Sequence, residues 1–194
     1  LLKSNDYNLV YKKAIEYYNK GDYQRAMNLL DGVRSVFVGQ AKAQNIAYYR
    51  AFCSYNMKDY QIASDLFKQF IQTYPESSFA EECLYMMGFC DYKASPKPRL
   101  DQQVTEKAIR EFQLYLSRYP YSMRKDKVNT YMDEMRDKLS YKAYLSAKNY
   151  YLREHYKAAV ISLQNCLKDY PGSKYREEIM YMLFVSKYQM AVNS

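Results

Sequence analysis

The chain has 194 residues, carries a formal net charge of +8, and contains 25 Tyr but only five Gly and five Pro. A chain of this length can form one large domain or one array of small units. The scarcity of glycine and proline, with no strict apolar alternation, favours an all-α fold over a β-sheet architecture. No run of 18 apolar residues occurs, which argues against a membrane-spanning helix in this chain.

The excess of basic residues is dispersed along the chain. Its densest basic run, RKDK at 124–127, is interrupted by an acid, and no nucleic-acid-binding motif accompanies it. We therefore expect a mildly basic helical surface and no nucleic-acid partner. The first residue is Leu, which suggests a piece of a longer precursor whose targeting segment lay upstream.

Five eight-residue strings begin and end with tyrosine. They are YKKAIEYY from Tyr11, YYRAFCSY from Tyr48, YMMGFCDY from Tyr85, YLSAKNYY from Tyr144 and YMLFVSKY from Tyr181. The fourth place holds a small residue in the first four strings and Phe184 in the fifth; the small residues are Ala14, Ala51, Gly88 and Ala147. Such internal repetition predicts a repeat architecture, with each string on the first helix of one repeat.

A second small residue follows in each of the first four repeats, at Ala26, Ala63, Ala108 and Ala159. Turns such as KGDY and MKDY separate the two places. Two antiparallel helices approach closely only where side chains are small, so these residues predict a helix pair in each repeat. Three second helices end in Tyr-Pro-x-Ser, and we expect serines to accept hydrogen bonds from the amides that open the next helix, namely Ser77 or Ser78, Ser122 and Ser173.

The third and fourth repeats depart from this spacing. Extra residues fall in SPKPRLDQQ, where Pro96 and Pro98 prevent a regular helix. The segment from Ser122 to Arg153 contains no Pro or Gly and predicts one long helix. The predicted repeats, nine helices in all, form a single array at 5–37, 40–75, 77–120 with a loop insertion at 95–104, 122–171 with the long first helix, and 173–194 as a partial repeat.

The four cysteines are predicted to be free thiols. Cys83 and Cys90 are seven residues apart on one predicted helix, roughly 10 Å along its axis, which is too far for a disulfide. Cys53 and Cys90 take equivalent places in successive repeats and should also lie too far apart. We interpret all four, including Cys166, as small apolar side chains packed between helices.

Small residues lie twelve apart and are followed by proline, and a Gly-Asp-Tyr type turn separates the two helices. This pattern resembles the tetratricopeptide repeat over nearly the whole chain. The layout of the insertion and the long helix is similar to the BamD family of outer-membrane assembly lipoproteins. The stretches that carry this are LYMMGFCDY at Leu84, EKAIREFQLYLSRYPYS at Glu106 and YKAYLSAKNYYLREHYKAAVISLQNCLKDYPGS at Tyr141.

The BamD resemblance implies a scaffold at the periplasmic face of the bacterial outer membrane. Its early repeats would receive segments of unfolded barrel proteins, and its later repeats would dock the periplasmic part of the core barrel subunit. The family carries a lipid anchor on a cysteine near the mature N-terminus. None of the four cysteines matches that position, so the anchor is expected upstream of Leu1.

Catalytic and cofactor sites are not indicated. The single histidine, His155, falls in a turn between helices, and no Gly-rich phosphate loop or zinc-type Cys/His spacing is present. The acid pairs Glu81–Glu82 and Glu177–Glu178 open predicted helices, where carboxylates oppose the helix dipole. We therefore expect no enzyme activity, no cofactor and no metal.

The resemblance to tetratricopeptide repeats places the first tyrosine of each string on an inner, concave surface. Tyrosine suits such a groove because it offers a rigid apolar ring and a hydroxyl. Aromatic residues one place past the small residue add apolar pockets in the second and third repeats, and a lysine there changes the character of the fourth. The predicted groove comprises Tyr11, Tyr48, Phe52, Tyr85, Phe89, Tyr144, Lys148 and Tyr181.

A second function class is a soluble chaperone or adaptor that clamps the acidic end of a partner. Such a clamp needs Lys and Arg on the concave face, where the first two repeats carry Asn8, Asn19, Asn45 and Asn56. An upstream signal peptide that ends in a lipidation cysteine would favour the outer-membrane scaffold, and a cytosolic start would favour the adaptor.

Overall fold

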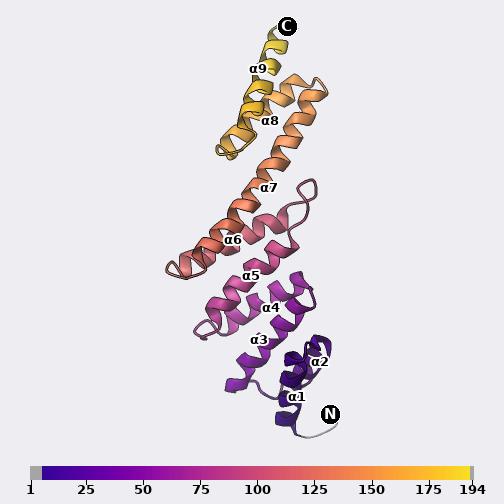
Figure 1. Cartoon of the computed structure of the whole chain (residues 1–194), viewed down its shortest axis with the longest axis vertical. Helices are drawn as coiled ribbons and strands as arrows, with labels where there is room; N and C mark the ends of the chain where they lie inside the picture. Colours follow the sequence, from indigo (N-terminus) through magenta and orange to yellow (C-terminus); the bar gives the residue numbers. More distant parts are fainter. Residues whose placement is uncertain (1–5, 193–194) are drawn as a thin grey trace. The chain divides into compact units, whose positions relative to one another are not determined.

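The computed structural model describes residues 6–192 and contains, within them, nine α-helices and no strand (Figure 1). The predicted all-α fold is confirmed. The helices are α1 (Tyr7–Asn19), α2 (Tyr23–Val33), α3 (Ala41–Asn56), α4 (Tyr60–Thr73), α5 (Ala80–Ala94), α6 (Gln103–Arg118), α7 (Lys125–Leu152), α8 (Tyr156–Asp169) and α9 (Arg176–Val192). The outermost predicted limits, residue 5 and residues 193–194, lie outside the described residues.

The chain forms two compact units. In the described range, the first comprises residues 6–95 and 103–128, and the second comprises residues 96–102 and 129–192. Within each unit, helices that follow one another in the chain pack together, as α1 does with α2 and α8 does with α9. This nearest-neighbour packing is typical of repeat arrays and agrees with tetratricopeptide-like helix pairs. The single array over the whole chain stays a prediction.

The small residues lie where the helices of a pair meet. All seven predicted alanines are fully buried, and Gly88 is buried with them; the alanines are Ala14, Ala26, Ala51, Ala63, Ala108, Ala147 and Ala159. A Cβ added at Gly88 would lie 2.9 Å from a ring carbon of Phe112 on α6. Contact between α5 and α6 at this point therefore leaves no space for any side chain on residue 88.

The turn inside a repeat has the same conformation in three repeats. The residue seven places after the small residue has a positive φ, at 78° for Gly21, 67° for Lys58 and 60° for Glu154. Glycine adopts this left-handed conformation without steric cost, whereas Lys58 and Glu154 adopt it against a penalty of about 1 kcal/mol. The turn therefore keeps the same backbone conformation in the two repeats that have no glycine at this position.

The serine after each helix-ending proline opens the next helix, as predicted. Ser77 Oγ accepts a hydrogen bond from Phe79 N at 3.3 Å, and Ser122 and Ser173 accept equivalent bonds from the amides two residues later. In all three cases the helix begins one residue after that amide. Of the two serines proposed for the third repeat, Ser77 makes this contact.

The predicted insertion and long helix are both present. The non-helical segment between α5 and α6 covers residues 95–102, so it ends two residues earlier than predicted. Helix α7 is 28 residues long and occupies the stretch predicted between Ser122 and Arg153 (Figure 1). All four cysteines are free and buried, which confirms the thiol prediction in the structure. Burial raises the pKa of Cys53 to about 12, so the thiol stays protonated near neutral pH.

A buried charged cluster lies between α4, α5 and α6, and the sequence did not indicate it. Asp91 accepts hydrogen bonds from Ser64 Oγ at 3.0 Å and from Lys107 Nζ at 2.9 Å. Glu111 lies 3.7 Å from the same ammonium group. Burial, followed by the neighbouring Asp91 carboxylate, raises the pKa of Glu111 to about 8. One lysine therefore serves two buried acids, and Glu111 keeps its proton in the folded state near neutral pH.

Replacement of Gly88 tests the close contact between α5 and α6. Gly88→Ala should destabilise the protein by about 1–3 kcal/mol, because the new methyl group overpacks the fully buried Phe112 ring. The gain in helix propensity, about 1 kcal/mol, opposes but does not cancel this cost. Urea denaturation measures the difference. Gly172→Ala is the matched control, since nothing lies within 4 Å of its added Cβ; equal effects at both positions would contradict the packing account.

Glu111 should make stability depend on pH. Its pKa is higher in the folded than in the unfolded chain, so its contribution is complete below the unfolded value near 4.5 and is lost as the pH rises through about 8. Wild-type protein should therefore lose stability between about pH 5 and about pH 8, and Glu111→Gln should lose less. Urea denaturation across this range measures both slopes. Glu106→Gln, an exposed change on the same helix, should leave the wild-type slope unaltered.

Candidate protein-binding surfaces

The eight predicted groove residues differ widely in exposure. Tyr85 and Tyr144 are buried, with 7% and 5% of their surface exposed. Tyr181 lies at the other extreme, with 63% exposed. The remaining predicted residues are half-buried: Tyr11, Tyr48, Phe52, Phe89 and Lys148. The structure therefore leaves six of the eight within reach of a partner and places two inside the helix packing.

Five half-buried rings on α3 and α5 form one continuous aromatic surface. Neighbouring ring centroids are 4.5 Å apart for Tyr48–Phe52, 6.4 Å for Phe52–Tyr55, 6.2 Å for Tyr55–Phe89 and 5.9 Å for Phe89–Tyr92. We call Tyr48, Phe52, Tyr55, Phe89 and Tyr92 the α3/α5 aromatic surface. It joins side chains of two successive repeats within the first compact unit.

Tyr55 and Tyr92 were not among the predicted site residues, although the sequence carried a signal for them. Each is the last residue of its string, one turn beyond Phe52 or Phe89, so a helical period places it beside that phenylalanine. Tyr11, by contrast, lies apart from this surface. Its ring contacts Phe37 at 6.2 Å, and Lys42 Nζ lies 5.9 Å from its centroid.

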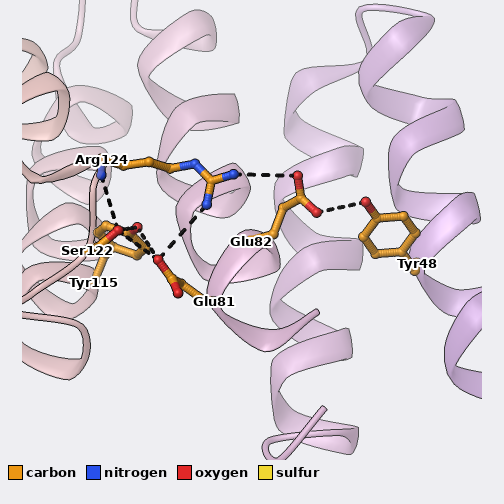
Figure 2. A network of polar contacts seen from close by, with 6 residues as sticks. All are labelled: Tyr48, Glu81, Glu82, Tyr115, Ser122 and Arg124. Atoms are coloured by element: carbon orange, nitrogen blue, oxygen red, sulfur yellow. Dashed lines mark hydrogen bonds and ion pairs between the residues drawn. The ribbon is translucent and has the colours of Figure 1, made fainter. Parts of the chain in front are cut away.

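The first tyrosine of the second string bonds to the next repeat. Tyr48 Oη donates to Glu82 Oε2 at 2.8 Å, across a sequence separation of 34 residues (Figure 2). The same separation relates Tyr144 to Glu178, and Lys148 Nζ donates a hydrogen bond to each of these two side chains. Burial and the hydrogen bond to Glu82 raise the pKa of Tyr48, so its hydroxyl remains a donor. We call these contacts the inter-repeat tyrosine bonds.

Arg124 completes a polar network around the start of α5 (Figure 2). Its guanidinium lies 3.8 Å from Glu82 and 4.0 Å from Glu81, and 5.1 Å from the centroid of Tyr85. Glu81 also accepts hydrogen bonds from Tyr115 Oη at 3.0 Å and from Ser122 Oγ at 2.7 Å. The two acids lie in the first turn of α5, as predicted, but they also join α3, α6 and the segment before α7.

The later repeats present a different surface. Tyr144 stacks on Tyr175 at 4.4 Å, and Lys148 Nζ donates both to Tyr144 Oη and to Glu178 Oε1 at 2.8 Å. The positive charge of Lys148 is therefore matched within the protein. Helix α9, in contrast, carries a row of exposed apolar side chains at helical spacing, which we call the α9 apolar face: Met180, Tyr181, Phe184 and Tyr188.

One comparison identifies the family. The family model of the YfiO outer membrane lipoproteins matches residues 3–194. The chain belongs to this family. Its membership confirms the predicted resemblance to outer-membrane assembly lipoproteins, because the BamD proteins are part of the same family. No curated protein matches the chain.

Membership places the protein among the lipoproteins of the outer membrane. No helix in residues 6–192 is both long and apolar enough to cross a membrane. Within the same residues, no group of three or more His, Cys, Asp and Glu could hold a metal ion. His155 lies in the exposed turn before α8, as predicted.

Removal of one hydroxyl tests the inter-repeat tyrosine bond. Tyr48→Phe should destabilise the protein by about 1–2 kcal/mol, because it deletes a hydrogen bond to a carboxylate and keeps the ring. Tyr181→Phe is the matched control at the same place of another string, and should change stability by less than about 0.5 kcal/mol because the side chain is exposed. Chemical denaturation measures both values. Equal stability of Tyr48→Phe and wild type would show that this hydrogen bond between repeats does not stabilise the fold.

Proposed function

We propose that the protein is a non-catalytic scaffold of the outer-membrane β-barrel assembly machinery. Its early repeats hold extended segments of unfolded barrel proteins, and its later repeats dock the periplasmic part of the core barrel subunit. The observation that carries the proposal is the continuous α3/α5 aromatic surface in a chain of the outer-membrane lipoprotein family.

The spacing of this aromatic surface suits an extended polypeptide. Side chains on one face of a β-strand repeat about every 6.6 Å, since each residue rises about 3.3 Å. The contacts Phe52–Tyr55, Tyr55–Phe89 and Phe89–Tyr92 have centroid distances of 6.4, 6.2 and 5.9 Å, close to that repeat. Alternate apolar side chains of a barrel strand can therefore lie against successive rings. Rigid aromatic rings lose little entropy when such a segment binds.

The α9 apolar face supports the second half of the proposal. Tyr181 and Phe184 are 63% and 70% exposed, and neighbouring Met180 and Tyr188 extend the same stripe. Clustered exposed apolar side chains of this kind mark interaction sites, and aromatic residues are enriched among the few side chains that dominate binding at protein interfaces. A folded partner such as the core subunit fits this face better than an extended segment, because the stripe follows one helix.

Truncation of two rings tests the aromatic surface. Phe52→Ala with Phe89→Ala should weaken binding of a fluorescein-labelled barrel-strand peptide by at least about 1 kcal/mol, or about fivefold in Kd, because aromatic anchors are lost. Fluorescence anisotropy measures the affinity, and circular dichroism establishes that the double variant is folded. Unchanged affinity in a folded variant would place the binding surface elsewhere.

Variants on the α9 apolar face provide the reciprocal control, because they should affect the second binding activity and not the first. Tyr181→Ser with Phe184→Ser should retain wild-type affinity for the peptide. The same variant should lose recovery of a large β-barrel protein from detergent-solubilised envelopes, identified by mass spectrometry, whereas Phe52→Ala with Phe89→Ala should keep it. Loss of both activities in both variants would contradict the assignment of two separate surfaces.

A further inference from the structure

The loop insertion and the long helix α7, which are the two departures from regular repeat spacing, meet in the second compact unit. The loop has a defined conformation, because Gln102 is only 3% exposed and donates to the carbonyls of Lys97 at 2.8 Å and Leu100 at 3.1 Å. Lys142 on α7 donates to the same Leu100 carbonyl at 2.8 Å. The loop is therefore fixed along one side of α7, with Arg99 held next to that helix.

A cavity of about 540 Å³ lies between Arg99 and α7. Leu145 and Leu152 provide apolar surface, two helical turns or about 10 Å apart, while Ser146 and Asn149 lie on the wall between them. Leu152 is 66% exposed. The proposed function does not use this cavity, and a regular repeat without the insertion would lack the Arg99 side of it.

The cavity has an excess of positive charge. It is lined by Arg99, Lys142 and Lys148, and no acidic side chain lines it. Lys148 is neutralised by Glu178 at 2.8 Å. Among the ion pairs of the described residues, none joins Arg99 or Lys142 to a carboxylate. Two cations thus stand beside two leucines, a combination that is complementary to an acidic segment with aliphatic side chains.

We propose that this cavity binds an acidic, leucine-containing polypeptide segment of a partner protein. A carboxylate of the segment lies between Arg99 and Lys142, and an aliphatic side chain packs on Leu145 or Leu152. Asn149 offers an amide donor and acceptor to the segment's backbone, which favours a polypeptide over a lipid. The span from Leu145 to Leu152 equals about three residues of extended chain. This site is independent of the α3/α5 aromatic surface and the α9 apolar face.

The test uses two labelled octapeptides, blocked at both ends, one of alternating Asp and Leu and one of alternating Lys and Leu. Wild-type protein should bind the Asp-Leu peptide, more weakly at high salt, and should not bind the Lys-Leu peptide. Arg99→Glu should weaken binding of the Asp-Leu peptide at least about fivefold in fluorescence anisotropy. Lys168→Glu is the matched control, because it reverses one exposed charge of the same unit away from the cavity.

A second variant tests whether the loop positions Arg99. Gln102→Ala leaves the charge unchanged but removes the hydrogen bonds to Lys97 and Leu100, so it should also weaken binding of the Asp-Leu peptide while circular dichroism stays helical. Equal binding of both peptides, or equal loss in Arg99→Glu and Lys168→Glu, would overturn the proposal. A third outcome would also overturn the proposal and would assign the cavity to lipid. In that outcome the wild type binds neither peptide but sediments with phosphatidylglycerol vesicles, and Arg99→Glu abolishes the sedimentation. Each result is independent of binding at the α3/α5 aromatic surface.

Discussion

The structure depends on the close approach of two helices at a residue that has almost no side chain. In four repeats, Ala or Gly on the first helix faces the second helix, and every one of these positions is buried. Gly88 shows how strict the constraint is, since one methyl group would lie 2.9 Å from the Phe112 ring. This close approach fixes how the two helices of a pair are oriented. The side chains three places before and four places after the small residue then lie at fixed positions on the first helix.

The helices could be predicted from sequence because their signals are local. Small residues, Tyr-Pro-x-Ser and the absence of breakers between Ser122 and Arg153 each act within one or two turns, and α7 and the serine turns appear where they were expected. Positive φ at Lys58 and Glu154 shows the opposite case, in which packing of the pair imposes a conformation that the residue type disfavours.

The contacts between repeats could not be predicted in the same way. Asp91, Lys107 and Glu111 come from two helices separated by the insertion, and their ionisation depends on burial that a sequence does not display. The acids Glu81 and Glu82 were interpreted as helix-start charges. That account is correct but incomplete, because Arg124, Tyr48 and Tyr115 reach them from other parts of the first unit (Figure 2).

The tyrosine at the first place of the second string has a physical role that limits how the surface can bind. Tyr48 donates its hydroxyl to Glu82 of the following repeat, and Tyr144 is linked to Glu178 of the following repeat through Lys148, so these hydroxyls serve the array. A bound segment that took a hydroxyl for itself would leave Glu82 or its equivalent without that hydrogen bond. Contact with a partner should therefore use ring faces, which the α3/α5 aromatic surface offers at Tyr48 and, from other places of the string, at Phe52, Tyr55, Phe89 and Tyr92. In the second string, tyrosine thus has two roles that depend on position: Tyr48 joins successive repeats, and Tyr55 extends the aromatic surface.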